Sequence, residues 1–301
     1  MNTQTHALPP LITTQELQQL QHRILQANDN RRRAGITSEP GSAHSHFRGQ
    51  GMELLDVRPY QAGDDIRHMD WRAMARSGRA ISKVFSEERG RELVLAVDRR
   101  PNMFFGTRSE IKASSAARAA AILGFSALSL REPVAAAIFE HTRQDFAATR
   151  TTSGLLPALI AIASAPSNTN TAPSTLAVFL KQLCQQFKRH TTLCLISDFH
   201  DITQSDNQAL AALADYFDII ALQIIDPAEE QLQDTGILTL RSPNSSHTVN
   251  IDTSNTNIRH QYQTIMAQRQ IDLHIIFQRH NIQMRKLYTN VETFSQLDGL
   301  L

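Results

Sequence analysis

Apolar runs and helical patterns alternate along the chain from residue 93 to its end. Short runs that are almost wholly apolar predict buried strands at 93–97, 134–140, 191–198, 219–226 and 282–287. Apolar residues at helical spacing predict helices between them, at 110–129, 155–163, 175–189, 204–216 and 257–279, with a terminal helix from about 291. Two further short runs, 237–240 and 248–251, are typical of a hairpin. This alternation predicts an α/β fold with a doubly wound, mostly parallel sheet of the Rossmann type.

The first 92 residues follow a different pattern. Thr13 or Thr14 can cap a helix, with Glu16 in its first turn, whose apolar stripe runs to about residues 28–30. Residues 31–51 are rich in Arg, Gly, Ser and His, which is loop composition. We therefore expect three parts: an N-terminal helix and flexible loop in 1–50, a charged β-rich module in 51–92, and the α/β domain in 93–301.

The charged module, residues 51–92, contains the only tryptophan of the chain. Apolar anchors accompany its charges, whereas a disordered charged segment would lack them, because without apolar burial it cannot offset the entropy of ordering. One interpretation is structural: the arginines bind carboxylates of the module, and buried aromatic residues fix the module to the sheet. The residues in these roles would be Arg58, Arg67 and Arg76 with Glu53, Asp64 and Asp70, and Tyr60 and Trp71 as anchors. The alternative is that some of these charges face a partner.

Composition narrows the function classes. The 30 basic and 29 acidic residues give a formal net charge of +1, so no overall field would attract nucleic acid or an anionic membrane. The two cysteines, Cys184 and Cys194, predict no disulfide framework and no cysteine-based zinc site. No apolar run approaches the ~18–20 residues of a membrane span, and the N-terminus lacks a signal-peptide pattern. We therefore expect a cytoplasmic protein with no membrane span and no nucleic-acid partner.

Three of the predicted strands end in an aspartate, namely Asp98, Asp198 and Asp226. Ligands of parallel α/β sheets bind outside the carboxyl ends of the strands. Two neighbouring carboxylates, together with the hydroxyl of Ser153 or Thr152 at a helix start, would suit Mg²⁺, which takes oxygen ligands and keeps several waters. The alternative is that these aspartates cap the following helices or bind backbone amides.

The segment before the first buried strand carries a specific resemblance. A glutamate, an Arg-x-Tyr, a Gly-Asp, an arginine, an Asp-Trp and an Ala-Arg follow one another here at spacings similar to those of the domain-of-unknown-function 58 family. The matching residues are Glu53, Arg58, Tyr60, Gly63, Asp64, Arg67, Asp70, Trp71, Ala75 and Arg76. The chain resembles that family from about residue 49 to its C-terminus, and the resemblance implies a von Willebrand factor A-like α/β domain.

The resemblance also implies a metal-ion-dependent adhesion site, from which this sequence departs. Its ligands here would be Asp98, Asn102, Ser153 and Asp198, with Mg²⁺ as the implied cofactor. Arg100 stands where the Asp-x-Ser-x-Ser pattern has a serine, and it brings a positive charge to the place of the cation. We therefore expect a degenerate site, with either a changed ligand set or a salt bridge between Arg100 and Asp198 in place of the metal.

By the same resemblance, we expect a non-enzymatic adaptor in client protein assembly or maturation. A MoxR-type AAA+ ATPase would supply force while this chain recognises the client. The sequence contains neither G-x-x-x-x-G-K-[ST] nor G-x-S-x-G. Two alternatives stay open: a metal-dependent hydrolase that uses Asp98, Asp198, His200 and Asp226, and a nucleic-acid-binding protein that uses the arginines at 31–33 and those of the charged module.

Overall fold

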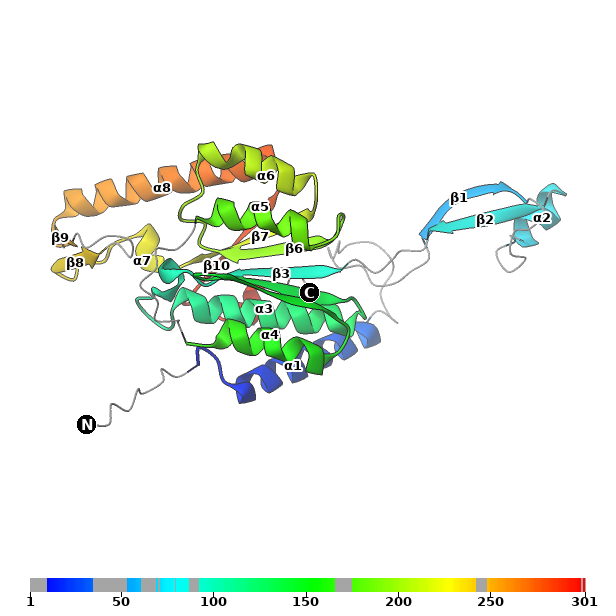
Figure 1. The fold of residues 1–301 in the computed structure, drawn as a ribbon, viewed down its shortest axis with the longest axis horizontal. Coiled ribbons are helices and arrows are strands. Elements are labelled where there is room, and N and C mark those ends of the chain that lie inside the picture. Colours follow the sequence, from blue (N-terminus) through cyan, green and yellow to red (C-terminus); the bar gives the residue numbers. More distant parts are fainter. Residues whose placement is uncertain are drawn as a thin grey trace.

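A six-stranded sheet lies at the centre of the computed structural model (Figure 1). The structure describes residues 10–34, 53–60, 69, 71–78, 80–86, 92–165, 175–241, 248–298 and 300. The strands of the sheet lie in the order β10-β7-β6-β3-β4-β5, and all are parallel except β5, which pairs antiparallel with β4. Their bounds are β3 Leu93–Asp98, β4 Val134–Phe139, β5 Arg143–Thr149, β6 Thr192–Ser197, β7 Asp218–Ile225 and β10 Gln283–Tyr288. The predicted mixed α/β fold with a mostly parallel sheet is thus confirmed.

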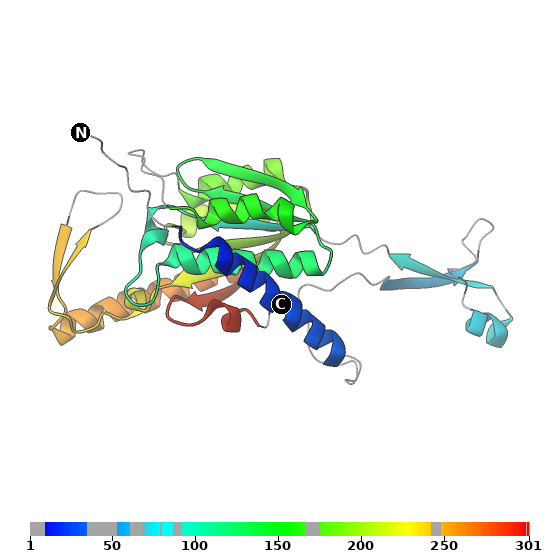
Figure 2. The same cartoon turned by 90° about the horizontal axis from the view of Figure 1, so that it is seen from below.

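Helices cover both faces of this sheet (Figures 1 and 2). One face packs against α1 Thr14–Ala34, α3 Lys112–Ser129, α4 Thr152–Ala163 and α9 Thr293–Gln296. The other face packs against α5 Leu176–Gln186, α6 Asn207–Ala214 and α8 Thr256–Arg279. Three short helices follow strands: η2 Pro101–Phe104, η3 Gln204–Asp206 and α7 Pro227–Glu230.

The sequence of β3 explains why it lies in the middle of this arrangement. Side chains of a strand point alternately to the two faces of its sheet. In β3 both sets are apolar and wholly buried: Leu95 and Val97 belong to the core under α3, and Val94 and Ala96 to the core under α5. The alanines of α3 allow close packing, and a Cβ atom added at Gly124 would lie 2.8 Å from a methyl group of Leu155. The centre of the domain is therefore tightly packed around β3.

One strand of the sheet was not predicted from the sequence. The segment Arg143–Thr149, which lies between the predicted strand 134–140 and the predicted helix 155–163, forms the edge strand β5. Its side chains are half-buried or exposed, so it lacks the continuous apolar run of the other strands. Because β5 is antiparallel, it returns the chain to the start of β4, where Thr149 pairs with Val134. The helix α4 therefore begins at the amino-terminal edge of the sheet.

The described part of the charged module is a hairpin of β1 Glu53–Pro59 and β2 Ile81–Ser86 with the helix α2 Trp71–Ser77 (Figure 2). In both views this hairpin stands apart from the six-stranded sheet. The prediction that Trp71 is a buried anchor is wrong, because its side chain is 56% exposed at the start of α2. Tyr60 is half-buried and Arg76 is exposed.

Other predictions about the module lie outside the described residues. These are the positions of Gly63, Asp64, Arg67 and Asp70 and the side chains of Glu53 and Arg58. The same holds for most of the predicted loop at 31–51.

A second hairpin, β8 Ile237–Arg241 with β9 Thr248–Asp252, follows α7 as predicted. Figure 1 shows it beside the first turns of α8. Among the helices that the structure describes, none combines the length and the apolar character needed to cross a membrane.

We predict that Leu95→Ala lowers the free energy of unfolding by about 2–5 kcal/mol, because it removes a wholly buried side chain and leaves a cavity. Val178→Ala, on the exposed face of α5, is the control and should change it by less than about 0.5 kcal/mol. Chemical denaturation followed by circular dichroism measures both. Equal effects of the two substitutions would contradict the central position assigned to β3.

Candidate functional site

Asp98, Asp198 and Asp226 lie at the same edge of the sheet, as their positions at strand ends predict. Asp98 is the last residue of β3, Asp198 follows β6, and Asp226 follows β7 and caps α7. These three strands are parallel neighbours, so their carboxyl ends meet at one edge. All three side chains are buried. Three buried carboxylates at one edge need compensating donors or cations.

Arg100 compensates the first of these carboxylates. The Asp98 side chain is 1% exposed, and its Oδ2 lies 2.7 Å from Nη2 of Arg100 and 2.6 Å from the Ser197 hydroxyl. Its Oδ1 accepts hydrogen bonds from the backbone amide and the Nε of Arg100, both at 3.0 Å. Since the arginine lies only two residues beyond the aspartate, a local turn brings the two groups together. Every oxygen of Asp98 is therefore engaged.

The same guanidinium also binds Asp201, in a two-point contact. Its Nη1 lies 2.6 Å from Oδ2 of Asp201, and its Nη2 lies 2.9 Å from Oδ1. Burial lowers the pKa of Arg100, but the hydrogen bonds to Asp98 and Asp201 raise it by more, so that it lies above its ordinary value. Arg100 is thus a permanent cation between two carboxylates. The predicted salt bridge between Arg100 and Asp198 is replaced by this arrangement.

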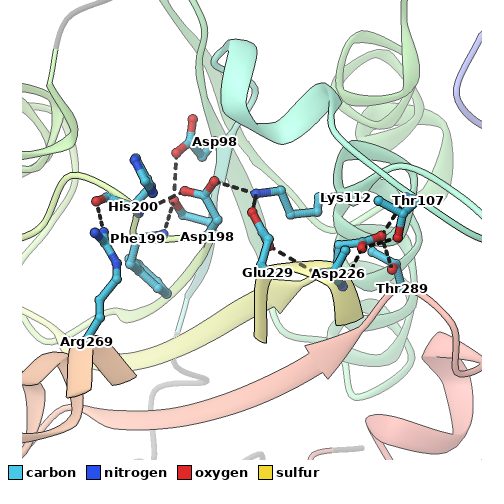
Figure 3. A network of polar contacts seen from close by, with 12 residues as sticks. Asp98, Thr107, Lys112, Asp198, Phe199, His200, Asp226, Glu229, Arg269 and Thr289 are labelled. Carbon is cyan, nitrogen blue, oxygen red and sulfur yellow. Dashed lines mark hydrogen bonds and ion pairs between the residues drawn. The ribbon is translucent and has the colours of Figure 1, made fainter. Parts of the chain in front are cut away.

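Lys112, the first residue of α3, compensates Asp198 instead (Figure 3). Its ammonium lies 2.7 Å from Oδ2 of Asp198 and 2.5 Å from Oε1 of Glu229, and its side chain is 1% exposed. Burial lowers the pKa of Lys112, while Asp198 and Glu229 raise it above the ordinary value. Burial raises the pKa of Glu229, and the lysine offsets only part of that rise. The other oxygen of Asp198 accepts from the backbone amide of His200 at 2.9 Å.

The donors that bind Asp226 in the described part of the chain are all neutral (Figure 3). Its oxygens accept from the amide and hydroxyl of Thr107, at 2.9 and 2.5 Å, and from the hydroxyl of Thr289 at 3.1 Å. The amide of Ala228 donates at 3.0 Å, so Asp226 is also the N-cap of α7. Burial raises the pKa of Asp226, but these hydrogen bonds lower it by more. The alternative role considered for strand-end aspartates, helix capping, is therefore the role of Asp226.

A second buried arginine joins this edge to α4. Arg99 donates to the backbone carbonyls of Ile162, Ser164 and Ala165, the last two at 3.0 and 3.1 Å. Its guanidinium also lies 3.7 Å from the carboxylate of Glu140. Because carbonyls at the end of a helix lack partners within it, Arg99 satisfies the C-terminus of α4. The end of α4, and not its beginning, faces the aspartates.

Ser153 therefore lies far from the other predicted metal ligands. It sits in the first turn of α4, whose N-cap is Thr151 and not Ser153. The neighbouring Arg150 donates to the carbonyl of Arg131, just before β4 begins, at 2.7 Å. This is the amino-terminal edge of the sheet, whereas Asp98 and Asp198 lie at the opposite edge. Thr152 is excluded from the ligand set for the same reason.

The arrangement does not fit the magnesium site that the resemblance implies. Asn102, half-buried in η2, is on the correct edge, but the carboxylates of Asp98 and Asp198 already hold Arg100 and Lys112. Among the residues that the structure describes, no group of three or more His, Cys, Asp or Glu side chains is placed to hold a metal ion. Side-chain cations occupy the place where a metal would bind.

His200, a candidate for hydrolysis, is exposed beside this network. Its backbone carbonyl accepts from Arg269 of α8, and its amide binds Asp198 (Figure 3). Burial of part of the ring and the nearby Arg269 cation hold the pKa of His200 below its ordinary value. A hydrolase would need a carboxylate that is free to hold a metal or activate water. The carboxylates that sequence reasoning offered for that role are all engaged by other donors.

Sequence reasoning missed Lys112 and Glu229, and it did not identify Asp201 as a partner of Arg100. A signal for Lys112 exists, since it is the only lysine in the segment 110–129, whose many alanines and other apolar residues predict burial. A lysine there must find a negative partner. The partner itself could not be read from the sequence, because Asp198 and Glu229 are 86 and 117 residues away.

Comparison with known proteins places the chain among uncharacterised relatives. The family model described as "Protein of unknown function DUF58" matches residues 56–272. Curated relatives from Mycobacterium bovis and two strains of Mycobacterium tuberculosis, each described as an uncharacterized protein, are 28% identical over 198 residues. The match covers 65% of this chain and 62% of each relative, so the chain spans less than two thirds of their length.

Solved structures are similar only at low identity. They include the conserved hypothetical protein BatB from Bacteroides thetaiotaomicron (13% identity, TM-score 0.43) and an aerotolerance-related membrane protein from Bacteroides fragilis (11%, 0.45). An uncharacterized membrane spanning protein from Vibrio fischeri is a third (12%, 0.23). Each match covers 69% of this chain and 95 or 96% of the other. Since two of these structures are described as membrane proteins, the predicted cytoplasmic location is corrected and withdrawn.

We predict that Lys112→Met lowers the free energy of unfolding by about 3–5 kcal/mol, because it leaves two buried carboxylates without their cation. Lys286→Met is the matched control: it breaks an ion pair of the same type, with Glu230, at the surface, and should cost about 0–1 kcal/mol. In a double-mutant cycle, adding Asp198→Asn to Lys112→Met should recover part of the lost free energy of unfolding. Similar costs for the two single variants would refute the buried compensation described above.

Proposed function

The chain belongs to the family of proteins of unknown function DUF58, and on this premise we propose that it is a non-enzymatic adaptor that binds a client protein beside a MoxR-type AAA+ ATPase. The ATPase supplies the force in this proposal, and the chain supplies recognition. The proposal includes the finer von Willebrand A-like assignment of the sheet, with an adhesion site whose metal is replaced by side chains. The mostly parallel sheet with helices on both faces supports it.

One observation favours a binding function over catalysis: the strand-end carboxylates form ion pairs or hydrogen bonds with side chains of the same chain. Arg100 and Lys112 hold Asp98 and Asp198, and Thr107 and Thr289 hold Asp226. Groups fixed in this way are poor general bases, because each would have to give up a hydrogen bond or an ion pair to take a proton. Their interactions instead hold the loops at this edge in fixed positions, and a preorganised edge favours recognition of a partner.

Two parts of the molecule take the two partners in this proposal. The client binds at the carboxyl edge of the sheet, around Asp98, Asn102 and Asp198, with Phe105 exposed beside them. The ATPase binds the charged module, where Trp71 is exposed at the start of α2. Exposed tryptophans are enriched at the energetic centres of protein interfaces.

We predict that the purified protein shows no saturable heat of binding when it is titrated with Mg²⁺ or Mn²⁺ at millimolar concentrations. The double variant Arg100→Ser/Lys112→Ser frees the carboxylates of Asp98, Asp198, Asp201 and Glu229, and it should gain binding of a divalent cation. Lys286→Ser is the control and should gain none. Thermal unfolding of each variant checks that it is folded. Saturable binding by the unaltered protein that Asp98→Ala abolishes would overturn the replacement of the metal.

We predict that a MoxR-type AAA+ ATPase of the same organism co-purifies with this protein, and that Trp71→Ala reduces the amount recovered by roughly tenfold or more. The substitution should leave the melting temperature unchanged, because the indole is largely exposed. Phe105→Ala removes an exposed aromatic ring at the client-binding edge and should leave recovery of the ATPase unchanged. Failure of the unaltered protein to retain any such ATPase would count against the proposed function.

A further inference from the structure

A cavity of about 350 Å³ opens next to Asp226, between the loop after η2, the helix α7 and the hairpin β8–β9. Its size is at the lower end of the range for sites that bind ligands. Pro227, Ala228, Leu232 and Leu238 give it apolar walls, and Thr107 and Arg108 lie at one side. A cavity with this lining suits an apolar side chain that has a negative group next to it.

Arg108 provides the charge for such a group. Its side chain is exposed, and it makes no hydrogen bond or ion pair with any residue that the structure describes. The neighbouring Thr107 differs, because its amide and hydroxyl both bind Asp226. An arginine binds a carboxylate at two points in a fixed geometry, so it would select the orientation of a partner as well as its charge.

The apolar wall of the cavity continues along the hairpin. Leu238, Leu240, Val249 and Ile251 share one face of β8–β9, since Leu238 pairs with Ile251 and Leu240 with Val249. Leu238 and Ile251 are half-buried, whereas Val249, farther out, is 58% exposed. The sheet of this hairpin has two strands in the described part of the chain, so each strand has an edge without a partner strand there. Such an edge can pair with an extended polypeptide.

The cavity is held in a fixed position relative to the strand-end network. Ala228 forms part of its wall, and the amide of the same residue donates to Asp226. Glu229, the next residue of α7, binds Lys112 and closes the capping box with the amide of Asp226. Binding in this cavity therefore needs little ordering of its walls, which favours affinity.

We propose that this cavity is the recognition site for an extended, apolar segment of the client, with one large apolar side chain in the cavity and an adjacent carboxylate on Arg108. The proposal rests on the adaptor function and names the chemistry of the client. The hairpin edge favours a polypeptide, because it offers backbone groups that an extended peptide can pair with. Nucleic acid is disfavoured, since a phosphate backbone needs several uncompensated cations in a row.

The test uses short fluorescein-labelled peptides of alternating serine and valine, titrated with the full chain by fluorescence anisotropy. One peptide ends in leucine with a free carboxylate, a second ends in leucine amide, and a third is an amide with glutamate before the leucine. The free-acid or the glutamate peptide should bind with a Kd on the order of 10–100 μM. The neutral amide should bind at least about tenfold more weakly than the better of the other two. Which of the two binds better tells whether the carboxylate belongs to a C-terminus or to a side chain.

Arg108→Gln should weaken binding of the preferred peptide by roughly tenfold or more, whereas Arg131→Gln, at the opposite edge of the sheet, should leave it unchanged. Ala228→Leu should abolish binding by filling the cavity while its backbone amide remains on Asp226. The proposal would be overturned if Arg108→Gln bound the preferred peptide as tightly as the unaltered protein does. It would also be overturned if the unaltered protein bound none of the three peptides. Arg108→Gln should still retain the ATPase, so failure of this site and failure of the adaptor function give different results.

Discussion

The ammonium of Lys112, buried between two carboxylates, is the interaction on which the carboxyl edge of the sheet depends. It joins the first residue of α3 to Asp198 after β6 and to Glu229 in α7. These are three elements from distant parts of the sequence. The charge is held by two opposite charges at hydrogen-bond distance, which offset the cost of burying it. The positions of the surrounding loops depend on this interaction. The helix α7 binds Asp226 through the amide of Ala228, and Asp226 in turn accepts a hydrogen bond from the amide of Thr107.

Arg100 repeats this solution one strand away. Together the two basic side chains bind four carboxylates, those of Asp98, Asp201, Asp198 and Glu229. Glu229 is the more exposed of the two carboxylates bound to Lys112, yet burial still raises its pKa above the ordinary value, and the negative charge of Asp198 adds to that rise. In a mostly parallel sheet the carboxyl ends of the strands lie at one edge. In this chain the carboxylates of Asp98 and Asp198 at that edge form ion pairs with side chains of the chain itself.

The sequence predicted most of the sheet and the three aspartates at its edge, because both depend on local patterns. Continuous apolar runs mark strands that are buried on both faces, and an aspartate directly after such a run lies at a strand end. The edge strand β5 left no such pattern, since half of its surface faces solvent. That one omission put Ser153 on the wrong edge, because an antiparallel strand reverses the direction in which the chain leaves the sheet. The partners of the aspartates could not be predicted either, because the pairing of Lys112 with Glu229 depends on the fold of the whole domain.

A metal ion in a protein comes from the solution, and its presence varies with what the surroundings contain. The cations beside Asp98 and Asp198 are instead residues of the chain, made with it and kept as long as it stays folded. These cations cannot dissociate from the folded protein as a metal ion can, so the edge does not depend on the metal content of its surroundings. Dependence on an outside ion could arise at this edge only through mutation, and loss of either basic residue alone would first give a less stable protein.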